Sequence, residues 1–317
     1  MIPLAPMTLG DLFDRWFKLI ASTWLRNLIV SAILLGPAAI VFAVAIENGF
    51  DQILQFAGRT GGEFDRETVS SIVGFFAWFF FGIVILLAGT IAATVGITIT
   101  GCSEMSSKAV SWQEALRSTL SIRLLKVFGQ YILEFVGLGL IVAIPYALIV
   151  AAIAAESILL GLLGGVLIFI TIAAAVYLVV SFAFTVPAIA WEHCDIIEAF
   201  RRSWTLVRGH WWRTFGILLL MSLIVSFAVS LLMTPLYLVV LWDFFRSYFE
   251  MLSSLGSGEP DAELVRTMLS SFGFGFGIVN AIASIAQVIV APLYTTVLYF
   301  DLRARRGEFN QAAQGQV

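Results

Sequence analysis

Residues 195–240 read DIIEAFRRSWTLVRGHWWRTFGILLLMSLIVSFAVSLLMTPLYLVV. A segment rich in Arg and Trp therefore leads directly into a long run dominated by apolar residues, 214–240. A helix needs about 20 apolar residues to cross roughly 30 Å of hydrocarbon, so this run predicts a transmembrane helix. The basic and aromatic segment before it is typical of a helix that lies at the membrane–water boundary.

Five further runs of this kind occur along the 317 residues. The six predicted spans are 28–46, 69–93, 128–150, 158–186, 214–240 and 272–299. The chain is 60% hydrophobic and only 12% charged, which excludes an ordinary soluble domain and a disordered chain. The predicted fold class is therefore an all-α membrane protein with six transmembrane helices.

The basic residues alternate between the two sides of these spans. Fourteen of the eighteen Lys and Arg residues fall in segments 1–27, 101–126, 188–213 and 301–317. Because Lys and Arg are retained on the cytoplasmic side during insertion, both termini are predicted to be cytoplasmic, in a bacterial inner membrane. Membrane lipids are the expected partners, since a basic face attracts anionic headgroups. No dense basic run or recognisable module suggests nucleic-acid binding.

An internal repeat also follows from the sequence. The segment around 200–213, moved back by 187 positions, matches Phe200 to Phe13, Trp211 to Trp24 and Arg213 to Arg26, and residues 198–201 match 114–117. We expect one membrane domain, 1–317, built from three units of about 8–100, 108–187 and 195–300, with a short tail at 301–317. Each unit would be an amphipathic interfacial helix followed by a helical hairpin.

The amphipathic segments supply the predicted membrane anchors. Thr8 and Asp11 suit a capping box at the start of the first segment. Interfacial Trp and basic residues commonly hold helices at the headgroup level. The residues predicted to contact lipid headgroups are Arg15, Trp16, Lys18, Trp24, Arg26, Arg201, Arg202, Trp204, Trp211 and Arg213.

Small residues predict where spans approach one another. Gly161 and Gly165 share one helix face, and so do Gly273 and Gly277. Such pairs let two helix backbones pack closely within a bilayer.

Four stretches resemble a known family. Residues 9–15 (LGDLFDR), 198–204 (EAFRRSW), 291–293 (APL) and 298–305 (LYFDLRAR) are similar to motifs of the glycerophosphoryl diester phosphodiesterase membrane-domain family and its stand-alone relatives. The resemblance covers nearly the whole chain and implies the membrane part alone. Only a short segment follows the last predicted span, so it implies no catalytic domain.

Candidate catalytic chemistry is sparse. The chain has two histidines, and His193-Cys194-Asp195 is a poor metal site because adjacent residues do not readily converge on one ion. No phosphate-binding glycine loop, HExxH or GxSxG motif is present. We therefore expect neither an enzyme nor a metal or other cofactor. Cys102 and Cys194 both fall on the predicted cytoplasmic side, where a structural disulfide is not expected.

Glu134 is the one acidic residue inside a predicted span. A carboxylate in hydrocarbon must be protonated, paired or facing water. One interpretation pairs it with Arg123, Lys126 or the interfacial arginines at the cytoplasmic membrane boundary. The other makes it part of a polar intramembrane site with Asn280 and Gln287, which are seven residues apart and share a helix face. Those two could equally join helices by hydrogen bonds.

Two functional hypotheses follow. The first is a non-catalytic scaffold or accessory subunit that organises lipid or partner membrane proteins, including by self-association. The alternative is a permease for a lipid or small amphiphile, with a path near Glu134.

Overall fold

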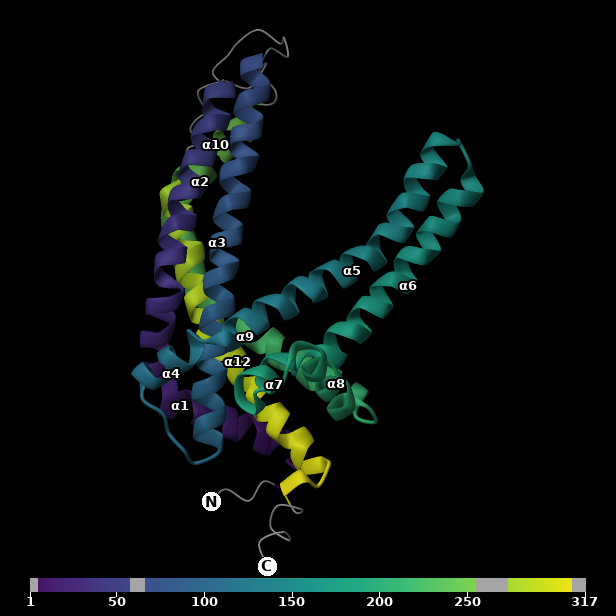
Figure 1. The fold of residues 1–317 in the computed structure, drawn as a ribbon. Helices are drawn as coiled ribbons and strands as arrows, with labels where there is room; N and C mark the ends of the chain where they lie inside the picture. The colour runs from purple at the N-terminus through teal and green to yellow at the C-terminus, as the bar shows by residue number, and fades with distance from the viewer. Residues whose placement is uncertain (1–4, 58–65, 255–272, 310–317) are drawn as a thin grey trace, which may run out of the picture. The chain divides into compact units, whose positions relative to one another are not determined.

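The computed structural model describes residues 5–57, 66–254 and 273–309, and these are helical with no strand among them (Figure 1). The helices are α1 (Leu9–Leu34), α2 (Gly36–Ala57), α3 (Arg66–Met105), α4 (Trp112–Thr119), α5 (Ile122–Ala154), α6 (Ile158–Phe182), α7 (Thr185–Glu192), α8 (Ile196–Val207), α9 (Trp211–Val240), α10 (Trp242–Ser254) and α12 (Phe274–Arg305). Six helical stretches are long and apolar enough to cross a membrane: Leu9–Leu34, Thr68–Met105, Ile122–Ala154, Ile158–Glu192, Trp211–Val240 and Phe274–Arg305. The prediction of an all-α protein with six such helices is confirmed. The predicted tail lies outside the described residues from 310 onward.

The first predicted span, 28–46, is wrong in its boundaries. The amphipathic segment and the start of that span form one helix, α1, which begins at the predicted capping box. There the Asp11 amide donates to Thr8 Oγ1 (3.3 Å) and the Thr8 amide donates to Asp11 Oδ2 (2.9 Å). Within the predicted span, α1 ends at Leu34 and α2 begins at Gly36, which is followed by Pro37. Proline has no N–H to donate and its ring crowds the preceding turn, so a break here is expected.

The chain packs as two compact units. Unit 1 comprises Met1–Thr23, Thr98–Met221 and Pro292–Val317, and unit 2 comprises Trp24–Ile97 and Ser222–Ala291. The boundaries of these units differ from those of the three predicted repeats, whose organisation stays a prediction.

Unit 2 is held together by small residues. A Cβ added at Gly82 or Gly89 of α3 would lie 2.8 Å from Ala45 Cβ or 2.6 Å from Ala38 Cβ, so α3 packs directly on α2. In the same unit, a Cβ at Gly277 of α12 would lie 2.5 Å from Ala43 Cα. The close approach predicted at Gly277 is confirmed, and it follows the small-residue rule for membrane helices.

Unit 1 contains the hairpin of α5 and α6, which run side by side in Figure 1, together with α4, α7, α8 and the C-terminal part of α12. The predicted glycine pair of α6 is not its contact point. A Cβ at Gly165 would meet nothing within 4 Å and one at Gly161 would be 3.8 Å from Ala152, whereas one at Gly164 would be 2.8 Å from Ile149 Cγ1. The two helices of the hairpin therefore pack against each other at Gly164.

Candidate functional site

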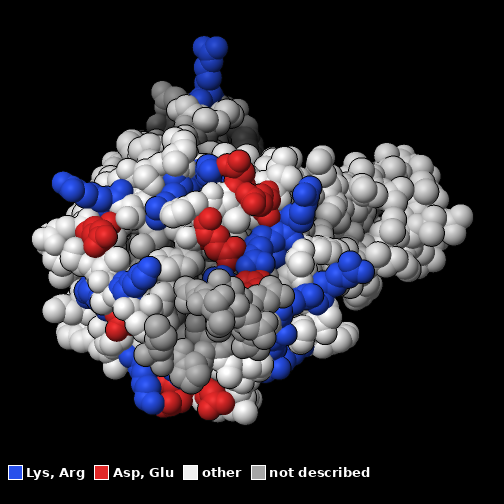
Figure 2. Space-filling model, turned by 60° about the horizontal axis from the view of Figure 1, so that its bottom comes forward, with Lys and Arg blue, Asp and Glu red and all other residues white. Residues whose placement is uncertain are grey.

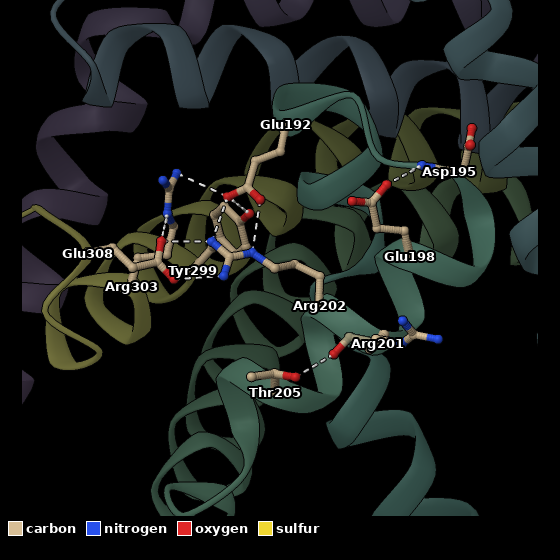
Figure 3. A network of polar contacts seen from close by, with 9 residues as sticks. All are labelled: Glu192, Asp195, Glu198, Arg201, Arg202, Thr205, Tyr299, Arg303 and Glu308. Atoms are coloured by element: carbon tan, nitrogen blue, oxygen red, sulfur yellow. Dashed lines mark hydrogen bonds and ion pairs between the residues drawn. The ribbon is translucent and has the colours of Figure 1, made fainter. Parts of the chain in front are cut away.

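Two charged clusters of unit 1 organise the ends of its helices. In the first, the guanidinium of Arg202 on α8 donates to both carboxylate oxygens of Glu192 (2.9 and 3.1 Å) and of Glu308 (2.7 Å each). Arg303 of α12 contacts the same two acids (3.2 and 2.8 Å), and the Tyr299 hydroxyl donates to Glu192. Figure 3 shows these side chains converging from α7, α8 and α12. We call these five residues the Arg202 cluster.

The Arg202 cluster favours the charged forms of Arg202 and Glu308. Burial opposes the charge on Arg202, but the hydrogen bonds that it donates to Glu308 and Glu192 outweigh this effect and raise the pKa of Arg202. Burial likewise works against the Glu308 carboxylate, yet the hydrogen bonds from Arg202 and Arg303 prevail and lower the pKa of Glu308. Fork-shaped guanidinium–carboxylate pairs of this kind are the strong class of charged hydrogen bonds.

The second cluster surrounds Asp301, whose side chain is completely buried. Arg213 donates to Asp301 Oδ2 at 2.7 Å, Arg305 donates to it at 3.0 Å, and the Met7 amide donates to Oδ1 at 2.7 Å. The Met7 carbonyl accepts from both arginines at 2.9 and 2.6 Å. The N-terminal segment is thereby tied to α9 and α12 within unit 1.

In Figure 2 basic and acidic side chains lie intermingled on the face in view, while the α5–α6 hairpin is white over its outer length.

The predicted headgroup residues fall into two groups. Trp24 (54% exposed), Trp204 (37% exposed), Lys18 and Arg201 lie on the surface, although Lys18 also pairs with Asp14 at 2.7 Å. Arg15, Arg26, Arg202, Trp211 and Arg213 are partly buried.

Trp16 is a core residue instead of an anchor. It is only 2% exposed, with its ring centroid 6.4 Å from that of Tyr294. Leu12, Trp16 and Leu19 of this segment are covered by protein, which leaves Trp16 no surface for a headgroup. Trp211 stacks between the rings of Tyr177 (5.4 Å) and Phe215 (5.3 Å).

A cavity of about 420 Å³ reaches Glu134. We call it the Glu134 cavity. Its wall is formed by α5, α6, α7, α8 and the α6–α7 connection, all in unit 1: Gln130, Tyr131, Leu133, Glu134, Gly137, Leu138, Ile141, Leu178, Val179, Phe182, Ala183, Thr185, Val186 and Phe200. The lining is mostly apolar, and Gln130 lies one helical turn before Glu134 on α5.

The predicted pairing of Glu134 with Arg123 or Lys126 is wrong. Arg123 donates to the Ala190 carbonyl (3.2 Å) and contacts His193 Nε2 (3.4 Å), while Lys126 pairs with Asp195 (2.5 Å). The physical reason is helix rise: Arg123 lies about 16 Å from Glu134 along α5, and Lys126 about 12 Å. Both basic residues instead hold the turn between α7 and α8.

The same turn contains the predicted metal-like triplet. His193 ends α7 with φ 64°, in the left-handed region that favours glycine. Burial, then the charges of Arg123 and Lys126, lower the pKa of His193, which favours the neutral ring. Asp195 and Glu198 form a capping box at the start of α8, so Asp195 has a structural role. Among the residues that the structure describes, no group of His, Cys, Asp and Glu is arranged to hold a metal ion.

Asn280 and Gln287 belong to unit 2, whereas Glu134 belongs to unit 1. Asn280 Oδ1 accepts a hydrogen bond from the Tyr237 hydroxyl at 3.1 Å, which joins α12 to α9. Gln287 is exposed. Asn280 thus takes the helix-joining role that the sequence left open, and a common path with Glu134 stays a prediction.

Gln130 is one of the polar cavity residues that the sequence analysis missed, together with Tyr131 and Thr185. Its side chain is 1% exposed, and the available signal was its position four residues before Glu134 on one helix face.

Residues 23–302 match the profile of a protein family described as "Domain of unknown function (DUF7847)". The chain belongs to this family. The DUF7847 region contains both Gln130 and Glu134, and it includes all six predicted spans. No curated protein and no solved structure matches the chain. The resemblance to the glycerophosphoryl diester phosphodiesterase membrane-domain family remains a prediction.

Proposed function

We propose that this DUF7847 protein is a non-catalytic, multi-pass membrane protein that binds a lipid or small amphiphile in the Glu134 cavity, as a permease or lipid-handling subunit does. The observation that carries the proposal is the cavity itself. It places the carboxyl group of Glu134 beside an apolar hollow, and Glu134 belongs to a helix that is apolar enough to span a membrane. Of the two functional hypotheses, the permease alternative requires such a cavity and the scaffold does not.

The chemistry of the lining supports this choice. Ligand sites are typically concave and apolar, with a few polar groups that fix orientation. The Glu134 cavity has that composition, with Glu134 and Gln130 close together on α5 and Leu178, Val179 and Phe182 on α6. An ionisable residue at this depth is a functional-site candidate, because placing a charge in a membrane is expensive.

The membrane orientation is part of the proposal. The excess of Lys and Arg in the predicted inner segments supports a bacterial inner-membrane location with both termini in the cytoplasm. A protease-sensitive tag at either end should be cut only after the cells are opened. Cleavage in intact cells would contradict this orientation.

A second candidate function rests on the α5–α6 hairpin. Its outward side chains include Phe135 (80% exposed), Ile153 (74% exposed) and Ile158 (82% exposed). Such a surface suits contact with lipid, with other membrane protein subunits or with a second copy of the chain, as a scaffold requires. Self-association or co-purifying subunits that persist in mild detergent, without any bound amphiphile, would favour the scaffold.

Photo-crosslinking tests the cavity directly. A single-chain amphiphile with a diazirine in its tail should label the cavity segments 133–141 and 178–186 of protein in nanodiscs, and excess unlabelled amphiphile should compete. The outward face of α6 at 166–170 is the internal control, because Val166, Phe169 and Ile170 are exposed within the same predicted span and lie outside the cavity. Even labelling of both regions, with no competition, would contradict the proposal.

A further inference from the structure

The Glu134 cavity brings a carboxylate and an unpaired amide oxygen to one apolar hollow. Apart from Tyr131, its polar lining consists of Gln130, Glu134 and Thr185, and the Thr185 hydroxyl already donates to the Phe182 carbonyl (2.9 Å). Gln130 lies one helical turn before Glu134, so the two side chains are neighbours on one face of α5. A ligand in the cavity can meet the Glu134 carboxylate and the Gln130 carbonyl oxygen as acceptors, with the Tyr131 hydroxyl as a further polar group.

The negative charge of Glu134 has no basic partner among the described residues. The two basic residues nearest to it along α5 are Arg123 and Lys126, and both are bonded at the α7–α8 turn. A carboxylate within a membrane helix is normally paired with a cation or kept neutral. A cation that enters the cavity would supply the missing counter-charge and keep Glu134 ionised.

Gln130 is an independent sign of a missing donor. The residue is 1% exposed, and its Oε1 atom is buried with no hydrogen-bond partner within the described part of the chain. Buried acceptors of this kind are rare and costly, and one that lines a cavity is explained by a donor the structure does not hold. A ligand N–H group that reaches both Oε1 and the Glu134 carboxylate would satisfy them together.

The rest of the wall suits an apolar body beneath a cationic head. The rings of Phe182 and Phe200 meet edge to face with centroids 4.9 Å apart, and Tyr131 adds a third aromatic ring. Aromatic faces attract ammonium groups and also cover alkyl chains. Leu138, Ile141 and Val179 complete an aliphatic lining.

We infer that the Glu134 cavity binds a single-chain amphiphile with a protonated primary amine, whose ammonium donates to the Glu134 carboxylate and to Gln130 Oε1. This inference rests on the proposed function and adds the chemical class of the ligand. The charge selects a cation, and the unpaired amide oxygen selects a cation that has N–H donors.

The test compares three ligands that share one tail. Octylamine, octyltrimethylammonium and octanol, each radiolabelled, are bound to the full-length protein in nanodiscs, and binding to empty nanodiscs is subtracted. Octylamine should bind about tenfold more tightly than either of the others, the ratio expected for one charge-assisted hydrogen bond. Octyltrimethylammonium keeps the charge without an N–H donor, and octanol keeps a donor without the charge.

Two variants assign the contacts. Glu134→Gln should weaken octylamine binding about tenfold and leave octanol binding unchanged, and Gln130→Leu should weaken octylamine binding severalfold. Glu156→Gln is the matched control, because Glu156 is an exposed acid between α5 and α6, outside the cavity. Equal thermal midpoints of all three variants and the wild type establish that the fold is retained.

The outcomes separate the two proposals. Equal affinity for the three ligands, or undiminished octylamine binding by Glu134→Gln, would overturn the amine assignment and leave an amphiphile site in place. Absence of binding above empty nanodiscs for every ligand would contradict the proposed function as well.

Discussion

Two kinds of carboxylate coexist within unit 1. In the Arg202 cluster, Glu192 and Glu308 each contact two arginines, and Asp301 is likewise held by Arg213 and Arg305. Glu134 has no ion pair within the described residues, although Arg123 and Lys126 occur on its own helix.

The difference separates structural from functional charge. Removing one partner from a buried ion pair leaves the other charge uncompensated, so paired acids should matter for stability. An acid that lines a cavity without a counter-charge adds little to stability and is available to a ligand. The predictions below test this contrast.

The largest effect is expected for Asp301→Ala. It leaves Arg213, Arg305 and the Met7 amide without their shared acceptor, which should cost about 3–5 kcal/mol of unfolding free energy. Reversible unfolding in mixed micelles with increasing dodecyl sulfate measures this loss. Asp14→Ala is the control, since Asp14 is exposed and pairs only with exposed Lys18, and it should change stability by less than about 0.5 kcal/mol. Similar losses for both would contradict a structural role specific to Asp301.

Arg202→Ala should cost about 3 kcal/mol in the same assay, slightly less because Arg303 still contacts Glu192 and Glu308. Its neighbour Arg201 is exposed, and Arg201→Ala should be near neutral. If Arg201→Ala were the more damaging change, the Arg202 cluster would not be the stabilising element.

Gly164→Val perturbs the hairpin that holds Glu134 without changing any charge. The new side chain would press on Ile149, and overpacking of this kind costs about 1–3 kcal/mol. Gly165→Val, one position further on, faces open space and should cost far less. Unfolding curves measure the stability of both variants. Equal unfolding free energies for Gly164→Val and Gly165→Val would contradict the packing of α5 on α6 at Gly164.

Acid should weaken the Arg202 cluster through Glu308. Because its folded pKa lies below its ordinary value of 4.5, the stabilisation is complete above that value and is lost as the pH falls through the folded pKa. Between about pH 5.5 and pH 3.5 the wild type should lose about 1 kcal/mol more stability than Glu308→Gln. Parallel pH profiles of the two proteins would show that Glu308 is not held as a carboxylate.

The smallest effect on stability is expected for Glu134→Gln. Removing an uncompensated charge should leave the unfolding free energy of the ligand-free protein within about 1 kcal/mol of wild type, or raise it slightly. A loss as large as that of Asp301→Ala would place Glu134 among the structural acids.

The helices were predictable because hydropathy and charge act locally. Span lengths and the capping box of Thr8 and Asp11 needed no knowledge of neighbours. The break at Leu35 could have been placed from Gly36 and Pro37, and helix rise alone excludes a contact between Glu134 and Arg123. The sequence could not predict tertiary contacts. It did not show whether Gly164 or Gly165 contacts α5, or that Trp16 is covered by protein.

The central claim is that Glu134 is reserved for an amine from outside the protein. Solid-state NMR tests it through the dipolar coupling between ¹⁵N-octylamine and the ¹³C-labelled carboxyl carbons of Glu in the nanodisc-embedded protein. The account predicts a coupling that corresponds to a separation of about 4 Å, as for an ammonium hydrogen-bonded to a carboxylate, and its loss in Glu134→Gln but not in Glu156→Gln. A coupling that survives in Glu134→Gln, or none in the wild type at saturating octylamine, would contradict it.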